Sequence, residues 1–153
     1  MYKVLIVDDQ NDVRTTLGKV VREAGYEVEL ASNPTEALDL FLQAKVPFDF
    51  ALIDVHLINP DDTDNSGVTL SVAFKKFHPS TVIILLTQYK RSRQAAWAVR
   101  YHGIYDFIRK STDLDQQIIE TLKDAERDLK FHENERDTFF TISIEENQSP
   151  GIR

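Results

Sequence analysis

The sequence of 153 residues contains no cysteine, five glycines, five prolines and a single tryptophan. Without cysteine the chain can form neither a disulfide nor a thiolate metal site, and it has no cysteine nucleophile. The four histidines lie at positions 56, 78, 102 and 132 and show no metal-ligand spacing. Any bound metal ion must therefore be held by oxygen ligands.

Long hydrophobic runs are also missing. No apolar run approaches the roughly 20 residues that a helix needs to cross a bilayer, and the N-terminus lacks the order of a signal peptide. We therefore expect a soluble, cytoplasmic protein that does not contact membranes. Hydrophobic residues make up 42% and charged residues 28% of the sequence, which is typical of a globular protein and excludes a fibrous or wholly disordered chain.

Charge is distributed unevenly around a net value of −7. Residues 1–112 hold 13 basic and 14 acidic side chains, whereas residues 113–153 hold 5 and 11. Residues 75–110 are locally basic, with eight Lys or Arg and one acidic residue. The last part of the sequence has no helix-turn-helix signal and few basic residues, so we expect no direct nucleic-acid binding.

Five segments have the pattern of β-strands. Continuous apolar runs at 3–8, 50–54 and 82–87 are typical of strands that are covered on both faces. The alternating segment 26–30 predicts an edge strand, and 105–108 predicts a short fifth strand. Amphipathic helical segments alternate with these strands, which predicts a doubly wound α/β fold with helices on both faces of a parallel sheet.

The helical segments carry recognisable ends and inner faces. Asn33, Pro34 and Glu36 supply a cap, a first-turn proline and a capping-box glutamate for the second helix. The third helix is predicted to follow Gly67 and to turn Leu70, Ala73, Phe74 and Phe77 inward. Near-heptad apolar steps continue the fifth helix through 129.

Polar side chains gather where the predicted strands end. Asp8 and Asp9 follow the first strand, Asp54 and Thr87 end the third and fourth, and Lys110 follows the fifth. Ligands of open parallel sheets bind beyond these carboxyl ends. Three adjacent carboxylates repel one another unless a cation bridges them, and Mg²⁺ suits oxygen ligands. Asp54, the central carboxylate, could then attack a phosphorus atom to give an acyl phosphate.

Four motifs at these strand ends resemble the receiver domain of two-component response regulators. They are Val-Asp-Asp at 7–9, Ile-Asp at 53–54, Leu-Thr at 86–87 and Gly-Ile-Tyr-Asp-Phe-Ile-Arg-Lys at 103–110, and the resemblance covers about residues 2–130. It implies the flavodoxin-like strand order 2-1-3-4-5. It also implies a receiver domain over 1–130, followed over 131–153 by an extension of the fifth helix and an acidic tail that would link to an output domain in a longer protein.

The resemblance assigns a role to each site residue. Asp54 resembles the phosphoacceptor, Asp9 a direct Mg²⁺ ligand, Asp8 a ligand acting through water, the His56 carbonyl a backbone ligand, Thr87 and Lys110 the phosphate contacts, and Phe107 the aromatic switch residue. The phosphoryl group would come from a sensor histidine kinase or a histidine phosphotransfer protein. Loading and hydrolysis would be self-catalysed and Mg²⁺-dependent, so the domain would not be a conventional enzyme.

This sequence departs from the family pattern after the predicted phosphoacceptor. Gly67 comes thirteen residues after Asp54 instead of about eight, which predicts a loop about five residues longer. The loop contains Asp61, Asp62 and Asp64, which we interpret as solvated turn residues rather than ligands.

Two further departures lie beside the predicted phosphate contacts. Gln88 stands where a small residue is usual and is expected to crowd the path of the phosphoryl group, and Ser111 replaces a proline that is usually preceded by a cis bond. The Lys110–Ser111 bond should therefore be trans. These changes keep open a second hypothesis, a receiver-like docking scaffold that is no longer phosphorylated. A small-molecule phosphohydrolase would require a DxD pair after the first strand, which this sequence lacks.

Two expectations concern self-association and the tail. A homodimer through the predicted fourth helix (about 92–101), the fifth strand (105–108) and the fifth helix (114–129) would set basic residues of one copy against acids of the other. The residues are Lys90, Arg91, Arg93 and Arg100 on one side and Asp113, Asp115, Glu120 and Asp124 on the other. Alternation of Phe140, Ile142 and Ile144 predicts a short docked strand, with a disordered stub as the equal alternative.

Overall fold

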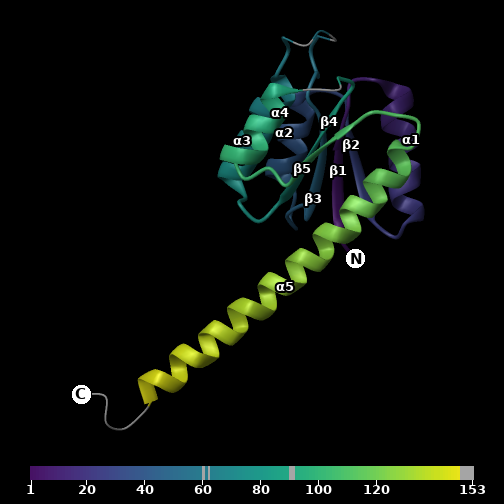
Figure 1. Cartoon of the computed structure of the whole chain (residues 1–153). Coiled ribbons are helices and arrows are strands. Elements are labelled where there is room, and N and C mark those ends of the chain that lie inside the picture. Colours follow the sequence, from purple (N-terminus) through teal and green to yellow (C-terminus); the bar gives the residue numbers. More distant parts are fainter. Residues whose placement is uncertain (60, 62, 90–91, 149–153) are drawn as a thin grey trace. The chain divides into compact units, whose positions relative to one another are not determined.

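The computed structural model describes residues 1–59, 61, 63–89 and 92–148. Strands and helices alternate along this part of the chain (Figure 1). The strands are β1 (Lys3–Val7), β2 (Glu27–Ala31), β3 (Phe50–Asp54), β4 (Val82–Thr87) and β5 (Asp106–Arg109). The helices are α1 (Asn11–Glu23), α2 (Pro34–Gln43), α3 (Ser66–Phe77), α4 (Arg93–Tyr101) and α5 (Leu114–Gln148).

The strands form one parallel sheet in the order β2-β1-β3-β4-β5. This confirms the predicted doubly wound fold and its strand order. Because all five strands run in the same direction, the residues that follow them meet at one edge of the sheet. β3 lies at the centre, and each of its five residues is buried.

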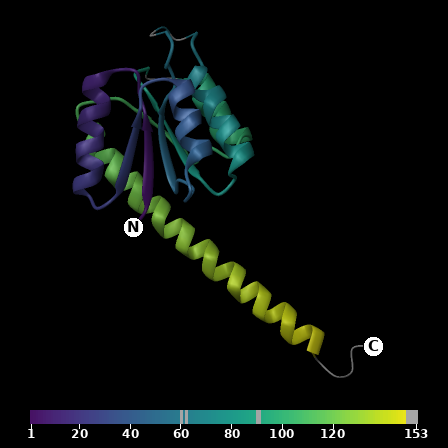
Figure 2. The ribbon, with the colours of Figure 1, turned by 180° about the vertical axis from the view of Figure 1, so that it is seen from behind.

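Helices cover both faces of the sheet (Figures 1 and 2). α2, α3 and α4 lie on one face, where Leu5 and Val7 of β1 join a core with Phe41 and Phe74. α1 and the first turns of α5, up to Ile119, lie on the opposite face. The alternation of side chains along β1 thus feeds two cores, which is why the strand reads as a continuous apolar run.

Local signals in the sequence account for the helix boundaries. The Asn33 side chain accepts a 2.8 Å hydrogen bond from the Glu36 N–H, which confirms the predicted cap of α2. The Glu36 carboxylate accepts a hydrogen bond from the N–H of Ser32, one residue before the cap, rather than from the Asn33 N–H that a capping box would use. Gly25 ends α1 with a φ of 100°. The Ser92 hydroxyl accepts a hydrogen bond from Ala95 N–H and caps α4.

One inward position of α3 was predicted wrongly. Leu70 and Phe74 are buried as expected, but Phe77 exposes 62% of its surface. Phe77 is the last residue of α3, so it lies one turn beyond the part of the helix that the sheet covers. The helix also begins at Ser66, one residue before Gly67 rather than after it.

The chain divides into two compact units, residues 1–119 and 120–153. The described part of the second unit is the continuation of α5 to Gln148. The predicted strand at Phe140–Ile144 is therefore wrong, because these residues are helical. Three alternating apolar positions are too few to fix a period, and a helix without glycine or proline propagates at little cost. Within the described residues, no helix is long and apolar enough to cross a membrane.

Candidate functional site

The three aspartates predicted from the strand ends come together. One carboxylate oxygen from each of Asp8, Asp9 and Asp54 lies within 4.8 Å of the others. Asp8 directly follows β1 and Asp54 is the last residue of β3, and both are buried, whereas Asp9 is exposed. The cluster therefore has two carboxylates fixed in the protein and a third that faces solvent.

Lys110 closes the buried side of this cluster. Its Nζ lies 2.7 Å from Asp8 Oδ2 and 2.9 Å from Asp54 Oδ2. The Lys110 N–H donates a 2.7 Å hydrogen bond to the Thr87 carbonyl, which fixes the backbone just beyond β5. There is no cis peptide bond among the described residues, so the Lys110–Ser111 bond is trans as predicted. Lysine thus reaches the site without the proline that usually follows it.

The charges of the site suit a divalent cation. Three carboxylates and one ammonium leave a formal charge of −2, and the donors are hard oxygen atoms with one exposed ligand, Asp9. Mg²⁺ prefers such a set because it binds through one or two carboxylates and keeps several waters. The residues present therefore fit the Mg²⁺ ion predicted from the sequence.

Electrostatics in the cluster couple Asp54 to Lys110. Burial raises the pKa of the Asp54 carboxyl and the Asp8 carboxylate adds to this, while the Lys110 ammonium opposes both. Burial by itself lowers the pKa of Lys110, but the Asp54 and Asp8 carboxylates outweigh it, so the pKa lies above the usual value for lysine. The lysine stays charged, and Asp54 is costly to ionise where no further cation is bound.

Backbone contacts hold the end of β3 in place. The His56 N–H donates a 3.0 Å hydrogen bond to Asp54 Oδ1, which orients the carboxylate. The Gly67 N–H donates a 2.9 Å hydrogen bond to the Val55 carbonyl and brings the first turn of α3 against the strand. A β-carbon on Gly67 would lie 1.8 Å from the Asp54 carbonyl oxygen. The glycine is therefore required by this close approach.

The long loop between β3 and α3 is organised by Asp64. Its carboxylate accepts hydrogen bonds from the N–H groups of Ile58, Asn59 and Ser66 at 2.7–2.8 Å. These backbone donors hold the pKa of Asp64 below its usual value despite the opposing effect of burial. Asp61 binds Thr63 in a similar turn. The prediction that these aspartates serve turns is confirmed, and Asp62 lies outside the described residues.

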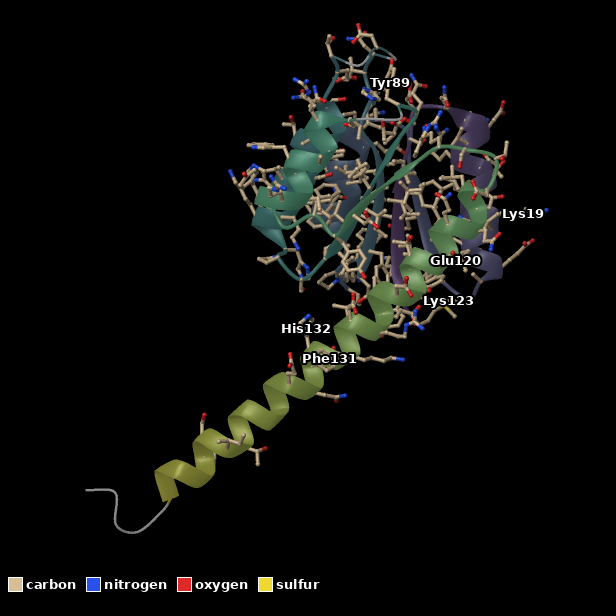
Figure 3. All side chains as sticks on the ribbon, viewed as in Figure 1. Lys19, Tyr89, Glu120, Lys123, Phe131 and His132 are labelled. Carbon is tan, nitrogen blue, oxygen red and sulfur yellow. The ribbon has the colours of Figure 1, made fainter. Side chains whose placement is uncertain are left out.

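Thr87 and its neighbours form the wall beside β4. The Thr87 side chain is fully buried, and its hydroxyl accepts a 3.2 Å hydrogen bond from the Tyr89 N–H. Tyr89 lies in the loop after β4 (Figure 3), and its ring meets the His56 ring edge-on with centroids 4.9 Å apart. Gln88 between them is exposed.

Some groups at the site were not predicted from the sequence. Both ring nitrogens of His56 are buried and have no hydrogen-bond partner within the described chain. On the α1 side, Arg14 Nη1 donates a 2.8 Å hydrogen bond to the Asp8 carbonyl. Residue spacing indicated neither feature, because both depend on how the chain packs in three dimensions.

Phe107, the predicted switch residue, lies on β5 and pairs with Leu85 of β4 in the sheet register. Its side chain is partly buried and packs against the core shared by α2, α3 and α4. The structure thus places it next to the strand that carries Thr87. The movement of Phe107 stays a prediction.

The fold and the acidic site are those of a class of signalling domain. The chain matches the response regulator receiver domain over residues 4–123. It therefore belongs to the response regulator receiver family, whose members are phosphorylated by histidine kinases.

Relatives of known sequence include the response regulator protein PilR of Pseudomonas aeruginosa, 34% identical over 112 residues, and the regulatory protein AtoC of Escherichia coli, 32% identical over 114 residues. These matches cover 73% and 74% of this chain but only 23% of each relative. The chain thus spans about a quarter of the length of the curated relatives it matches.

Solved structures show the same fold. A receiver domain protein from Clostridium thermocellum superposes with a TM-score of 0.74 at 23% identity, covering 86% of this chain and 98% of that one. TrrA of Thermotoga maritima, solved in complex with Mg²⁺ and BeF, gives a TM-score of 0.68 at 27% identity and covers 82% and 99%.

Proposed function

We propose that this chain is a phosphorylation-dependent signalling switch in which Asp54 accepts a phosphoryl group from a sensor histidine kinase or a histidine phosphotransfer protein. The observation that carries the proposal is the position of the Asp54 carboxylate. It is buried at the end of β3, 2.9 Å from the Lys110 ammonium and beside Asp8 and Asp9. The Lys110 ammonium holds one oxygen of this carboxylate, and the other oxygen is then in a fixed position to attack phosphorus.

The transfer needs each of these groups. An Asp54 oxygen forms the new bond to phosphorus as the bond from phosphorus to the donor histidine nitrogen breaks, and the nitrogen leaves with the electron pair. Charge on the three phosphoryl oxygens then requires matched donors. Lys110 supplies an ammonium and Thr87 a hydroxyl. Asp8, Asp9, Asp54 and the His56 carbonyl would hold Mg²⁺, which neutralises phosphoryl charge when bound.

The switch lies in the neighbouring strand and helix. Thr87 ends β4, and a hydroxyl drawn toward the phosphoryl group would give up its hydrogen bond from the Tyr89 N–H. Phe107 would then turn further inward beside β4. We expect the phosphorylated chain to favour a second arrangement of α4 and β5, because the phosphoryl group contacts one arrangement better than the other.

Intact mass spectrometry tests the function directly. Wild-type protein incubated with Mg²⁺ and acetyl phosphate should gain one phosphoryl group. Asp54→Asn should gain none, and EDTA should prevent the gain in the wild type. An unmodified wild-type protein under all conditions would instead support the docking scaffold, and single-site labelling of Asp54→Asn would assign the phosphoacceptor elsewhere.

The proposal includes a homodimer through α4, β5 and α5. Arg93 and Arg100 of α4 are exposed, as are Asp113 and Asp115 near the start of α5, whereas Lys90 and Arg91 lie outside the described residues. Exposed ion pairs contribute only about 0–1 kcal/mol each, so they select the partner surface more than they stabilise it. Sedimentation with and without beryllium fluoride should show a dimer that phosphoryl mimicry strengthens, and a monomer in both conditions would refute it.

A further inference from the structure

A groove between α3 and α4 is an apolar feature of the described residues that lies outside the phosphoacceptor site. It encloses about 570 Å³ and is lined by Val68 and Val72 of α3, by Phe77 at the end of α3, and by Trp97 and His102. None of these side chains contributes to the acidic site. We call it the α3–α4 groove.

The rim of the α3–α4 groove exposes large aromatic side chains. Phe77 and Trp97 each leave more than half of their surface accessible, as does Tyr101, whose ring lies beside Trp97. The Trp97 ring is nevertheless held in place, with its centroid 4.3 Å from the His102 ring and 6.3 Å from the Tyr101 ring. Exposed clusters of this kind mark interaction sites, and a ring that is already fixed loses little entropy when a partner covers it.

The two helices that form the groove carry basic side chains and no acidic ones. α3 and α4 contain Lys75, Lys76, Arg93 and Arg100 and no Asp or Glu. The Lys75 ammonium is engaged by the carbonyls of Pro79 and Thr81. The other three are exposed and form no ion pair with any residue in the described part of the chain. An occupant of this groove should therefore combine apolar side chains with negative charge.

The second unit of this chain has that chemistry. Residues 120–148 contain nine acidic and four basic side chains on one helix, and residues 131–142 within it contain three acidic side chains and one arginine. Phe131, labelled in Figure 3, and Ile142 are both exposed. They lie eleven residues apart, which is three turns, so they share one side of the helix over a rise of about 16 Å. This length matches the roughly 18 Å of the twelve residues of α3.

We propose that the α3–α4 groove receives residues 131–142 of α5 from a second copy of this chain. Phe131 and Ile142 would cover Trp97 and Phe77, while acidic residues of the helix meet Lys76, Arg93 and Arg100. A second copy brings this acidic helix with its apolar side to the groove, wherever the second unit of the first copy lies. In a two-fold pair each copy gives one helix and receives one, which doubles the buried surface.

This contact is independent of phosphorylation of Asp54. It lies on the α3 side of α4, whereas the homodimer proposed above uses the β5 side. One can therefore be present without the other, and Asp54→Asn should leave the groove contact unchanged.

Trp97 reports on the contact because it is the only tryptophan in the chain. In the full-length protein, its fluorescence emission should shift to shorter wavelength as the concentration rises from about 1 μM to about 1 mM, a range that covers weak dimers. The double variant Phe131→Ala with Ile142→Ala should raise the protein concentration at the midpoint of this shift at least tenfold. Ile144→Ala is the matched control, because Ile144 is equally exposed but points to the opposite side of α5 from Ile142.

The outcomes separate the possible occupants. A protein that sediments as a monomer and keeps the same emission maximum at every concentration overturns the proposal. A constant short-wavelength maximum in that monomer indicates that the chain covers its own groove, and a constant long-wavelength maximum indicates that no second copy binds. A shift that Phe131→Ala with Ile142→Ala leaves unchanged also overturns it. Added salt should weaken the association without abolishing it, and sedimentation of the same variants should give the same order of affinities.

Discussion

Gly67 and Asp54 approach so closely that a β-carbon on the glycine would lie 1.8 Å from the aspartate carbonyl oxygen. The first turn of α3 is therefore packed directly on the backbone of the residue that we propose is phosphorylated. The loop between the two residues is longer than usual for the family, and it ends at this contact. The extra residues form a loop closed by Asp64 and leave the start of α3 in place.

We expect Gly67→Ala to lower the free energy of unfolding by about 1–3 kcal/mol, because a methyl group forced into packed backbone must displace the helix or the strand. Gly18→Ala is the control. A β-carbon there would meet the end of the Leu30 side chain at 3.1 Å, which can rotate, and alanine favours a helix interior by about 1 kcal/mol. Urea denaturation measures the free energy of unfolding of the two variants. Equal stability of the two variants would contradict the steric argument.

Ionised Asp54 should destabilise the protein where Mg²⁺ is absent. Burial raises its pKa in the folded state above 3.8, so its contribution to stability is fully present below that pH and is lost as the pH rises through the folded pKa. In EDTA, Asp54→Asn should therefore raise the free energy of unfolding at pH 7 and leave it nearly unchanged near pH 3.

Added Mg²⁺ should reverse this difference, because the metal stabilises the wild-type site by binding the ionised carboxylate. Thermal denaturation at the two pH values, with EDTA and with Mg²⁺, measures both effects. An Asn variant that is less stable than the wild type in EDTA at pH 7 would show that the Lys110 and His56 contacts outweigh the cost of burying Asp54.

The hydrogen bonds at the start of α2 should make a separate contribution to stability that also depends on pH. Asn33→Ala removes the side-chain acceptor of the Glu36 N–H and should cost about 1 kcal/mol. Hydrogen bonds from the Ser32 N–H and hydroxyl hold the pKa of Glu36 below 4.5, so the stability from Glu36 is present above that pH and is lost as the pH falls through the folded pKa.

Thr35→Ala is the control for α2, because Thr35 is exposed on the same first turn and makes none of these cap contacts. Circular dichroism melts of Asn33→Ala, Glu36→Gln and Thr35→Ala at pH 7 and pH 3 measure the effect. The loss from Glu36→Gln should be smaller at pH 3, and a loss that is the same at both pH values would rule out the ionised carboxylate as its cause.

The spacing of apolar residues predicted the alternating strands and helices. The polar residues at the ends of the predicted strands then indicated the cluster of charges. β3 could be identified because a central parallel strand is apolar on both faces, and the edge position of Asp8, Asp54 and Lys110 follows from parallel strands alone. The contact between the His56 and Tyr89 rings could not be predicted. It joins two loops whose path depends on tertiary packing rather than on a repeating pattern.

The errors have a physical cause as well. Phe77 has the helical spacing of the inward residues of α3 but is exposed. The spacing of apolar residues predicts which side of a helix faces the sheet, but it does not predict how far along the helix the sheet extends. The residues around Ile142 alternate as a strand would, yet they continue a helix that was already formed. In both cases the pattern of apolar residues is present in the sequence, but the neighbouring structure determines the burial or the conformation of these residues.

Gln88 separates two side chains that define the wall of the site. Thr87 before it is fully buried, and the Tyr89 ring after it packs on His56. Gln88 itself is exposed at the carboxyl edge of the sheet, where family members usually have a small residue. We therefore expect its side chain to be the bulk that a phosphodonor or an attacking water meets on the way to Asp54.

We expect Gln88→Ala to speed loading from acetyl phosphate and to shorten the phosphorylated lifetime. Both steps are in-line displacements at phosphorus, so a group that obstructs the line of attack slows each of them. The change should not exceed about tenfold in either rate, which is roughly 1.4 kcal/mol in each barrier. Phosphorylated protein is followed by intact mass during loading and after removal of the donor. Gln94→Ala, at a partly buried position on α4, is the control, and rates that are identical in Gln88→Ala and wild type would show that access does not limit either step.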